Sequence, residues 1–427
     1  MGSPAIPRAV RPRVAVFHPG TQHSYQSALA FQEADCLAWF ATGVYYRPGR
    51  WPYSLARVLP AAKRQRWERR FGQRRLEGLS DERLVTRGGH EWLVLAAQQW
   101  GSTGGWATRM IRTRNRAFAR WAGRRAVGTA DVLYGYDTAS LEAFRIAREH
   151  GLRTVLDQTG SYWGHVAEVL RREAEAHPEF AAAGTAGMIE NATANAPRFD
   201  AELALADQVL VGSSFAAGTL PASRLRPGSL HVVPYGADVP AEPPPARPDR
   251  KVIELLYAGG LHAAKGIYYL LEAMRRLESP NVRLTLVGRL AIDRRALDPY
   301  RSWITYVPHV PRPELFRMYG EADAFIFPAL CEGFGIVLIE AAAHGLPLIA
   351  ATSTGAPDLI GNSGCGILVP PCDADALAAA IDRFASLPAG ARAEMGRGAR
   401  ERAKGYSWAA YRRRLREVVL DSPDLEG

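Results

Sequence analysis

The chain has 427 residues, 47% of them hydrophobic, and a formal net charge of +10 that comes almost entirely from arginine. This length exceeds that of an ordinary single domain, so we expect two domains. The sequence lacks both an apolar run long enough to cross a bilayer and the apolar core of a secretory signal, which predicts a cytoplasmic protein. Four cysteines without CxxC spacing argue against a disulfide framework and a structural zinc site.

Short apolar runs alternate with alanine-rich amphipathic segments in the first half of the chain. The first run, Arg13–His18, ends at a Pro-Gly turn and leads into helical sequence from Ser24 onward. Similar runs lie at Asp131–Leu133, Arg153–Asp157 and Gln208–Val211. This alternation is typical of parallel βα units, and it predicts an α/β domain over residues 10–240.

Two arginine-rich stretches, Lys63–Arg75 and Trp106–Arg125, interleave aromatic with basic side chains. Basic amphipathic helices of this kind bind anionic lipid or nucleic acid. The competing interpretation is a solvated helix face. An anionic membrane surface, at the inner face of the cell membrane, therefore stays open as a partner.

Residues Pro240–Arg250 contain five prolines and predict an extended linker over 241–250. A second series of apolar runs follows at Val252–Tyr257, Val282–Val287, Ile304–Val307, Ala324–Phe327 and Leu346–Ala350. It predicts a second doubly wound domain over 251–404, and a C-terminal helix within 405–427 is expected to cross back to the first domain. Ligands bind at the carboxyl ends of such strands, so we expect the site between two facing sheets.

The sequence CEGFGIVLIE at Cys331–Glu340 has the pattern of an anion-binding turn. Its glycines let the backbone approach a ligand closely. The amides at the start of the following helix suit a pyrophosphate, and they belong to Phe334, Gly335 and Ile336. The carboxylates of Glu332 and Glu340 lie roughly 7 Å apart along the helix axis. That spacing is too wide for both to act on one bond, so they suit two hydroxyls of one long ligand.

This stretch resembles the signature of glycosyltransferase family 4, in which seven residues separate two glutamates. The resemblance implies a GT-B fold, in which two Rossmann-like doubly wound domains face a central cleft. It also implies that Glu332 contacts the donor sugar, that Glu340 binds the nucleotide ribose, and that the main chain from Phe334 to Ile336, beside Gly333, holds sugar and phosphate. The competing interpretation is a capping glutamate followed by an incidental one.

Other motifs follow in the order of that family. Tyr257–Gly266 resembles the loop that brings an arginine and a lysine to the donor diphosphate. Lys265 is present, whereas Gly260 occupies the arginine position and Arg289 is the candidate substitute. A lysine at a helix start opposes the helix dipole, which favours a functional role over a surface lysine. The resemblance further implies that a later loop faces the phosphates through Thr354 and Gly355.

The acceptor side falls in the first half, where polar residues follow predicted strands and where the family places acceptor contacts, often with a histidine. The acceptor-binding candidates are His18, Gly20, His23 and Tyr136. His165 and Asp137 join Glu332 and Lys265 as catalytic candidates. The alternative for each candidate in this half is a satisfied turn residue.

The reaction implied by the resemblance is transfer of a hexosyl unit from a nucleoside diphosphate sugar, with UDP, GDP or another nucleotide, to an acceptor hydroxyl with retention of configuration. The acceptor would be a glycan, a glycolipid or a small molecule. We expect no nucleic-acid partner, no cofactor and no metal, because Asp373 in Asp373-Ala374-Asp375 suits a helix N-cap. Alternatives are a catalytically silent GT-B protein that binds lipid or nucleic acid, and a GT-B sugar-nucleotide epimerase or phosphorylase.

Overall fold

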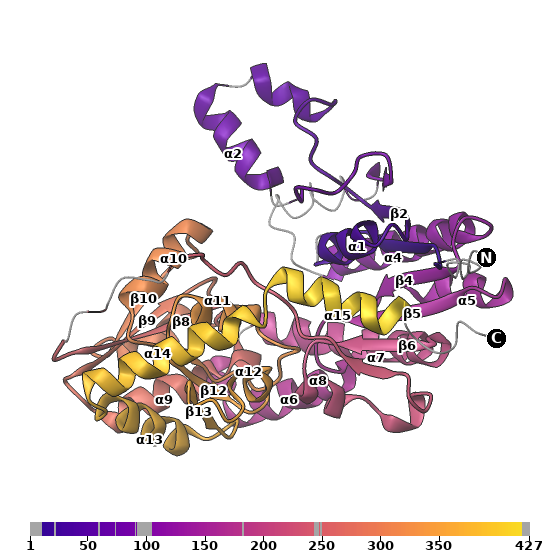
Figure 1. The fold of residues 1–427 in the computed structure, drawn as a ribbon. Coiled ribbons are helices and arrows are strands. Elements are labelled where there is room, and N and C mark those ends of the chain that lie inside the picture. Colours follow the sequence, from indigo (N-terminus) through magenta and orange to yellow (C-terminus); the bar gives the residue numbers. More distant parts are fainter. Residues whose placement is uncertain are drawn as a thin grey trace, which may run out of the picture. The chain divides into compact units, whose positions relative to one another are not determined.

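The computed structural model describes residues 11–20, 23–58, 60–72, 74–89, 91, 105–181, 183–242, 247 and 250–420. The predicted linker over 241–250 lies largely outside these residues, so its conformation stays a prediction. Two parallel sheets with intervening helices make up the described chain (Figure 1). The α/β class expected from the alternation of apolar runs is therefore confirmed.

The first sheet has the strand order β3-β2-β1-β4-β5-β6-β7. Its strands are β1 (Val14–His18), β2 (Leu37–Thr42), β3 (Leu84–Thr86), β4 (Val132–Tyr136), β5 (Arg153–Gln158), β6 (Gln208–Val211) and β7 (Leu230–Val232). The helices between them are α1 (Ser24–Glu33), η1 (Tyr53–Val58), α2 (Ala61–Gly72), α4 (Gly105–Ala126), α5 (Leu141–Glu149), α6 (Trp163–Ala176), η2 (Pro178–Phe180), α7 (Ala183–Leu205), α8 (Ser214–Thr219) and η3 (Ala222–Arg224). The chain order reverses between β1 and β4, which pair in parallel, so the loops after these strands lie at the topological switch point.

The second sheet has the strand order β10-β9-β8-β11-β12-β13. Its strands are β8 (Ile253–Ala258), β9 (Val282–Val287), β10 (Ile304–Val307), β11 (Ala324–Phe327), β12 (Leu348–Ala351) and β13 (Gly366–Val369). The helices are η4 (Ala263–Lys265), α9 (Ile267–Leu277), η5 (Arg294–Tyr300), α10 (Arg312–Glu321), α11 (Ile336–Ala343), α12 (Ala356–Ile360), α13 (Ala374–Ala385), α14 (Ala389–Lys404) and α15 (Trp408–Leu420). Here the switch point lies between β8 and β11.

Buried apolar residues run along whole strands of both sheets. In β11 and β12 every residue is buried, as expected for parallel strands that are covered on both faces by helices. These rigid strands fix where their carboxyl ends, and hence the loops that follow them, are placed. No helix of the described residues is both long and apolar enough to pass through a bilayer.

Residue contacts gather the chain into two compact units. Unit 1 comprises the residues up to Asp157, Arg198–Val209 and the residues from Arg412 on, and unit 2 comprises Gln158–Pro197 and Leu210–Tyr411. Helix α6 and the first part of α7 therefore belong to the same unit as the second sheet. The domain boundaries inferred from the sequence stay predictions.

Candidate functional site

Two loops meet at the switch point of the second sheet, within unit 2. One joins β8 to α9 through η4, and the other joins β11 to α11. The amide of Leu330 donates to the carbonyl of Ala264 at 2.9 Å. A Cβ on Gly266 would collide with the carbonyl oxygen of Pro328, and the φ of Gly266 is +67°, so only glycine fits there. This close approach sets the preceding residue, Lys265, against the second loop.

Lys265 and Glu332 form an ion pair at this junction, and each side chain is 21% exposed. Burial lowers the pKa of Lys265 to about 8, while nearby Cys331 acts in the opposite direction. Withdrawing an ammonium group from water costs free energy unless it meets an anion. The pair therefore offers a cation for a ligand anion and a carboxylate for a ligand hydroxyl, side by side.

The turn after Glu332 is held by contacts that require glycine. Ser213 donates to the carbonyl of Gly333 at 2.5 Å, and a Cβ on Gly333 would lie 2.6 Å from the carbonyl oxygen of Thr159. Gly335, the N-cap residue of α11, has a φ of +89°, and a Cβ there would lie 2.8 Å from the Phe327 ring. Among the described residues no carbonyl or side chain accepts from the amides of Phe334, Gly335 and Ile336. A helix start with unpaired amides is suited to an anion.

Phe334 fixes this turn by packing its side chain into the interior of unit 2. Its side chain is buried, and its ring lies 6.2 Å from that of Tyr235 and 5.8 Å from that of Tyr406. The amide of Gly355 donates to the Phe334 carbonyl at 2.8 Å, and a Cβ on Gly355 would lie 2.6 Å from the ring. The hydroxyl of Thr354 accepts from a backbone amide at the start of α12. These contacts give Thr354 and Gly355 a supporting role, and their contact with phosphate stays a prediction.

Glu340 lies one turn into α11, and its side chain is largely buried. Its carboxylate accepts from Arg312 at 2.5 Å and from the hydroxyl of Tyr319 at 3.5 Å. Arg312 begins α10, just beyond β10, and half of its side chain is exposed. This arginine was not predicted from the sequence, although it follows a strand and a proline. A ribose hydroxyl that binds Glu340 has to share its carboxylate with Arg312.

The predicted second cation, Arg289, follows β9 and is exposed. Among the described residues its guanidinium forms no ion pair, and no contact joins it to Lys265 or Glu332. Gly260 accepts from the hydroxyl of Tyr257 at 2.8 Å. Beside it, burial lowers the pKa of His262 to about 4, and its Nδ1 atom is buried with no hydrogen-bond partner among the described residues. His262 is thus a neutral neighbour of Lys265.

His165 lies in the first turn of α6, which packs against η4 in unit 2. The cluster that joins them contains Leu170 and Ala264. The ring of His165 lies 6.0 Å from that of Phe215, and burial lowers the pKa of the histidine. No hydrogen bond of the described residues joins His165 to Lys265 or Glu332, so its catalytic role stays a prediction.

In unit 1 the acceptor-binding candidates gather at the switch point of the first sheet. His18 Nδ1 accepts from the amide of Gly20 at 3.2 Å, and burial lowers the pKa of His18 to about 3. His23 Nε2 lies 2.8 Å from a carboxylate oxygen of Asp157, and both side chains are buried. The ring of Tyr136 contacts the rings of both histidines, at 5.1 and 5.3 Å. Asp157, the last residue of its predicted strand, was not among the residues predicted for the site.

Asp137 follows β4 in unit 1 and is buried. Its amide donates to the carbonyl of Asp157 at 3.0 Å. The buried Glu202 holds the same loop, because its carboxylate accepts from the amide of Thr138 at 2.6 Å and from that of Ser140 at 2.9 Å. Burial raises the pKa of Glu202 to about 7. The loop that carries Asp137 is therefore fixed by hydrogen bonds to a buried carboxyl group.

No group of three or more metal-ligating side chains occurs in the part of the chain that the structure describes. Asp373 caps α13, since its carboxylate accepts from the amide of Ala376 at 2.8 Å. The N-cap role predicted for Asp373 is confirmed.

Residues 239–402 match the family model for glycosyl transferases group 1. This segment contains Lys265, Glu332 and Glu340. The match covers this segment, which is less than half of the chain. The resemblance noted in the sequence is confirmed at this level.

A relative and two solved structures extend the comparison. Glycogen synthase of Mycobacterium tuberculosis is 31% identical over 200 residues, which are 45% of this chain and 48% of the relative, so the match spans about half of its length. Sucrose-phosphate synthase from Thermosynechococcus elongatus superposes with a TM-score of 0.59 at 20% identity, over 96% of this chain and 98% of that one. Anabaena Alr3699/HepE in complex with UDP gives a TM-score of 0.56 at 14% identity, over 95% and 99%. The group 1 segment is thus part of a GT-B fold.

Proposed function

We propose that this protein is a glycosyltransferase that moves a hexosyl unit from a nucleoside diphosphate sugar to an acceptor hydroxyl. The observation that carries the proposal is the Lys265–Glu332 pair beside the unpaired amides at the start of α11. A cation, a carboxylate and a positive helix end within one turn match the two chemical parts of such a donor, its diphosphate and its sugar hydroxyls.

The proposed site stabilises the leaving group electrostatically. As the bond between the sugar C1 and the phosphate oxygen breaks, negative charge grows on the diphosphate, and Lys265 and the helix amides stabilise this charge. Glu332 holds the sugar by a hydroxyl. We propose that these groups act without a metal ion, which removal of divalent ions with a chelator tests directly.

The proton of the acceptor hydroxyl can be removed without a separate catalytic base. The acceptor oxygen forms its bond to C1 on the face that the phosphate leaves, and its proton passes to the departing phosphate oxygen. Configuration at C1 is then retained, as in family 4. An inverted anomer in the product, identified by proton NMR, would refute this part of the proposal while leaving the glycosyl transfer intact.

The comparisons support a sugar or polyol acceptor and a nucleotide donor without naming either. One neighbour in fold was solved with UDP, and the names of the others refer to glycogen and sucrose phosphate. We therefore propose a role in glycan, glycolipid or glycoside synthesis, with His18, His23 and Tyr136 at the acceptor side.

Donor hydrolysis tests the proposal without knowledge of the acceptor. The protein is incubated with UDP, GDP, ADP and dTDP hexoses, and release of the nucleoside diphosphate is measured. We expect slow release from one donor class that disappears in Glu332→Ala and in Lys265→Ala but persists in Glu394→Ala, which removes an exposed carboxylate of α14. No release from any donor, or equal release by Glu332→Ala, would refute the proposal. Labelled product analysis separates transfer from epimerisation or phosphorolysis.

A further inference from the structure

The segment between β2 and β3 folds around a small core of its own in unit 1. Tyr46, Tyr53 and Phe71 form this core with Val44, and Trp67 of α2 packs against it. The rings of Tyr46 and Tyr53 lie 5.3 Å apart, and those of Tyr53 and Phe71 lie 5.7 Å apart. The apolar face of α2 is thus buried against this core. Any exposed apolar side chains of the segment therefore come from η1 and the residues before it.

Three large apolar side chains project from this segment. Trp51 is 80% exposed, Leu55 50% and Val58 80%, whereas the other exposed large apolar residues of the described chain, Val232 and Leu368, are 40% and 37% exposed. Single exposed apolar side chains are common, but three within eight residues form a patch, and such patches mark contact sites. A tryptophan among them is typical of a membrane interface.

The same segment is strongly basic. Residues 47–75 contain ten lysine or arginine residues and one acidic residue, Glu68, in a chain whose formal net charge is +10. Within the described residues Arg47 pairs with Asp81 and Arg74 with Glu91. No ion pair of the described chain involves the other basic residues whose side chains are described, which are Arg50, Arg57, Lys63, Arg64 and Arg75. This charge is therefore available to an anionic partner.

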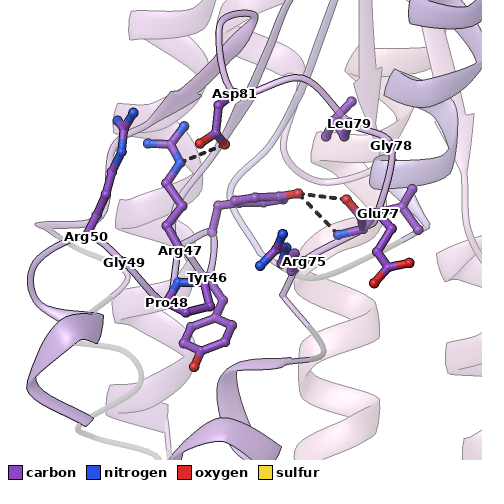
Figure 2. A pocket seen from close by; sticks show the side chains of 12 residues that line it. Tyr46, Arg47, Pro48, Gly49, Arg50, Arg75, Glu77, Gly78, Leu79 and Asp81 are labelled. Carbon is purple, nitrogen blue, oxygen red and sulfur yellow. Dashed lines mark hydrogen bonds and ion pairs between the residues drawn. The ribbon is translucent and has the colours of Figure 1, made fainter. Parts of the chain in front are cut away.

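A pocket of about 410 Å³ opens between the two ends of the segment. Figure 2 shows Arg47, Arg50 and Arg75 along its wall, with Arg47 bonded to Asp81 at 3.0 Å. The hydroxyl of Tyr45, which also lines the pocket, donates to the backbone carbonyl of Leu76 at 3.0 Å. Two carboxylates, Glu77 and Asp81, also line the pocket, and Arg47 is paired with Asp81, so its three arginines leave one net positive charge. Arginine binds phosphate through several parallel hydrogen bonds, and Arg50 and Arg75 are the candidates to do so here.

We propose that the described residues of the 43–81 segment form a docking surface for anionic lipid, in which Trp51, Leu55 and Val58 enter the bilayer interface and the arginine-lined pocket receives a lipid phosphate. Apolar side chains next to unpaired cations match the two layers of such a surface, the acyl boundary and the headgroups. A nucleic acid would engage the cations and leave Leu55 and Val58 in water. The inference does not depend on the glycosyl-transfer reaction.

The second basic stretch of the sequence is not part of this surface. It lies in α4, where Phe118 is buried and the ring of Trp121 lies 6.3 Å from that of Trp39. Arg125 stacks over both tryptophan rings. Phe118 and Trp121 therefore pack inside unit 1, and the exposed arginines of α4 form a solvated helix face.

Vesicle flotation of the full chain tests the proposal. The wild-type protein is mixed with vesicles of phosphatidylcholine alone or of phosphatidylcholine with phosphatidylglycerol, at low and high salt. We expect recovery with the anionic vesicles only, reduced by salt because the charges involved are exposed. Equal recovery with both compositions, or none with the anionic one, would overturn the proposal. Stabilisation by inorganic phosphate without flotation would assign the pocket to a soluble anion and reject the lipid.

Matched variants separate the two parts of the surface. Replacing Trp51, Leu55 and Val58 by serine should weaken partitioning roughly tenfold or more, whereas Val232→Ser with Leu368→Ser should leave it unchanged. Arg50→Gln with Arg75→Gln should weaken it roughly fivefold per charge, whereas Arg294→Gln with Arg295→Gln, on an exposed stretch of η5, should not. Circular dichroism shows whether each variant folds. If a variant fails to fold, the lipid and salt dependence of wild-type flotation still tests whether the surface binds anionic lipid.

Discussion

The lowered pKa of Lys265 leads to a quantitative prediction for nucleotide binding. Burial places this pKa at about 8, against an ordinary value of 10.5. Only the ammonium form carries the charge that binds a diphosphate, and the free protein holds about nine-tenths of Lys265 in this form at about pH 7 but about one-tenth at about pH 9. The apparent dissociation constant is the intrinsic one divided by the competent fraction. Binding should therefore weaken roughly tenfold across this range.

Isothermal titration with the nucleoside diphosphate selected by the hydrolysis assay measures this change. The charge of the diphosphate changes little over the range, because the last proton of a phosphate group dissociates near about pH 6. The matched control is Lys265→Arg, since a guanidinium stays protonated throughout and its affinity should be constant. His262 and His165 cannot imitate the effect, because burial lowers both of their pKa values and leaves them neutral at these pH values.

Two results would refute the reasoning. A wild-type affinity that is constant up to about pH 9 would mean that Lys265 keeps an ordinary pKa or does not contact the diphosphate. An equal decline in Lys265→Arg would assign the titration to another group. In either case the proposed electrostatic role of Lys265 in stabilising the leaving group loses its support.

The remaining predictions concern the framework of the two units. Gly335→Ala should lower the free energy of unfolding by roughly 1 to 3 kcal/mol and weaken nucleotide binding, because the φ of Gly335 is +89°. Gly390→Ala, where no atom lies near the added Cβ, should do neither. Thermal unfolding measures the stability of each variant, and calorimetric titration measures its nucleotide affinity. Ser213→Ala should cost roughly 1 to 3 kcal/mol in denaturant unfolding, since the carbonyl of Gly333 loses its buried donor. The folded pKa of His18, about 3, lies below its ordinary value of 6.5, so the unfolded chain binds the proton first and stability falls as pH falls through this window. His18→Gln should show a smaller loss between about pH 7 and about pH 5 in urea unfolding, and an equal loss would exclude His18 as the cause.

The sequence was sufficient to locate strands that are bounded by turns. The run Arg13–His18 corresponds to β1 and the run Ala324–Phe327 to β11, because each is a buried apolar segment that ends at a proline or glycine turn. Strands β2, β3, β7 and β13 were missed. β2 follows α1 after three residues with apolar sequence on both sides, so periodicity does not separate them. β3 and β7 have three residues each, and β13 has four.

The residues of the candidate site likewise fall into those that the sequence predicted and those that it did not. Lys265 and Glu332 were found because each lies in a local pattern of glycines and charge at the end of a strand. Ser213, Arg312 and Asp157 were missed as partners because they act across the fold. Ser213 is 120 residues from the carbonyl that it binds, and Asp157 is 134 residues from His23. No local periodicity encodes such a contact, which depends on the order of strands in the sheet.

The glycines of unit 2 explain why local patterns identify this site so well. At Gly266, Gly333, Gly335 and Gly355 an added Cβ would lie less than 3.0 Å from a backbone or ring atom of another segment. At Gly266 and Gly333 that atom is a main-chain oxygen, so close backbone contacts constrain the residues next to Lys265 and Glu332. A ligand that is recognised by such amides requires glycine at fixed positions, and this requirement is visible in the sequence. The histidines of unit 1 lie on ordinary backbone and are positioned by side-chain partners, which leaves no comparable local pattern.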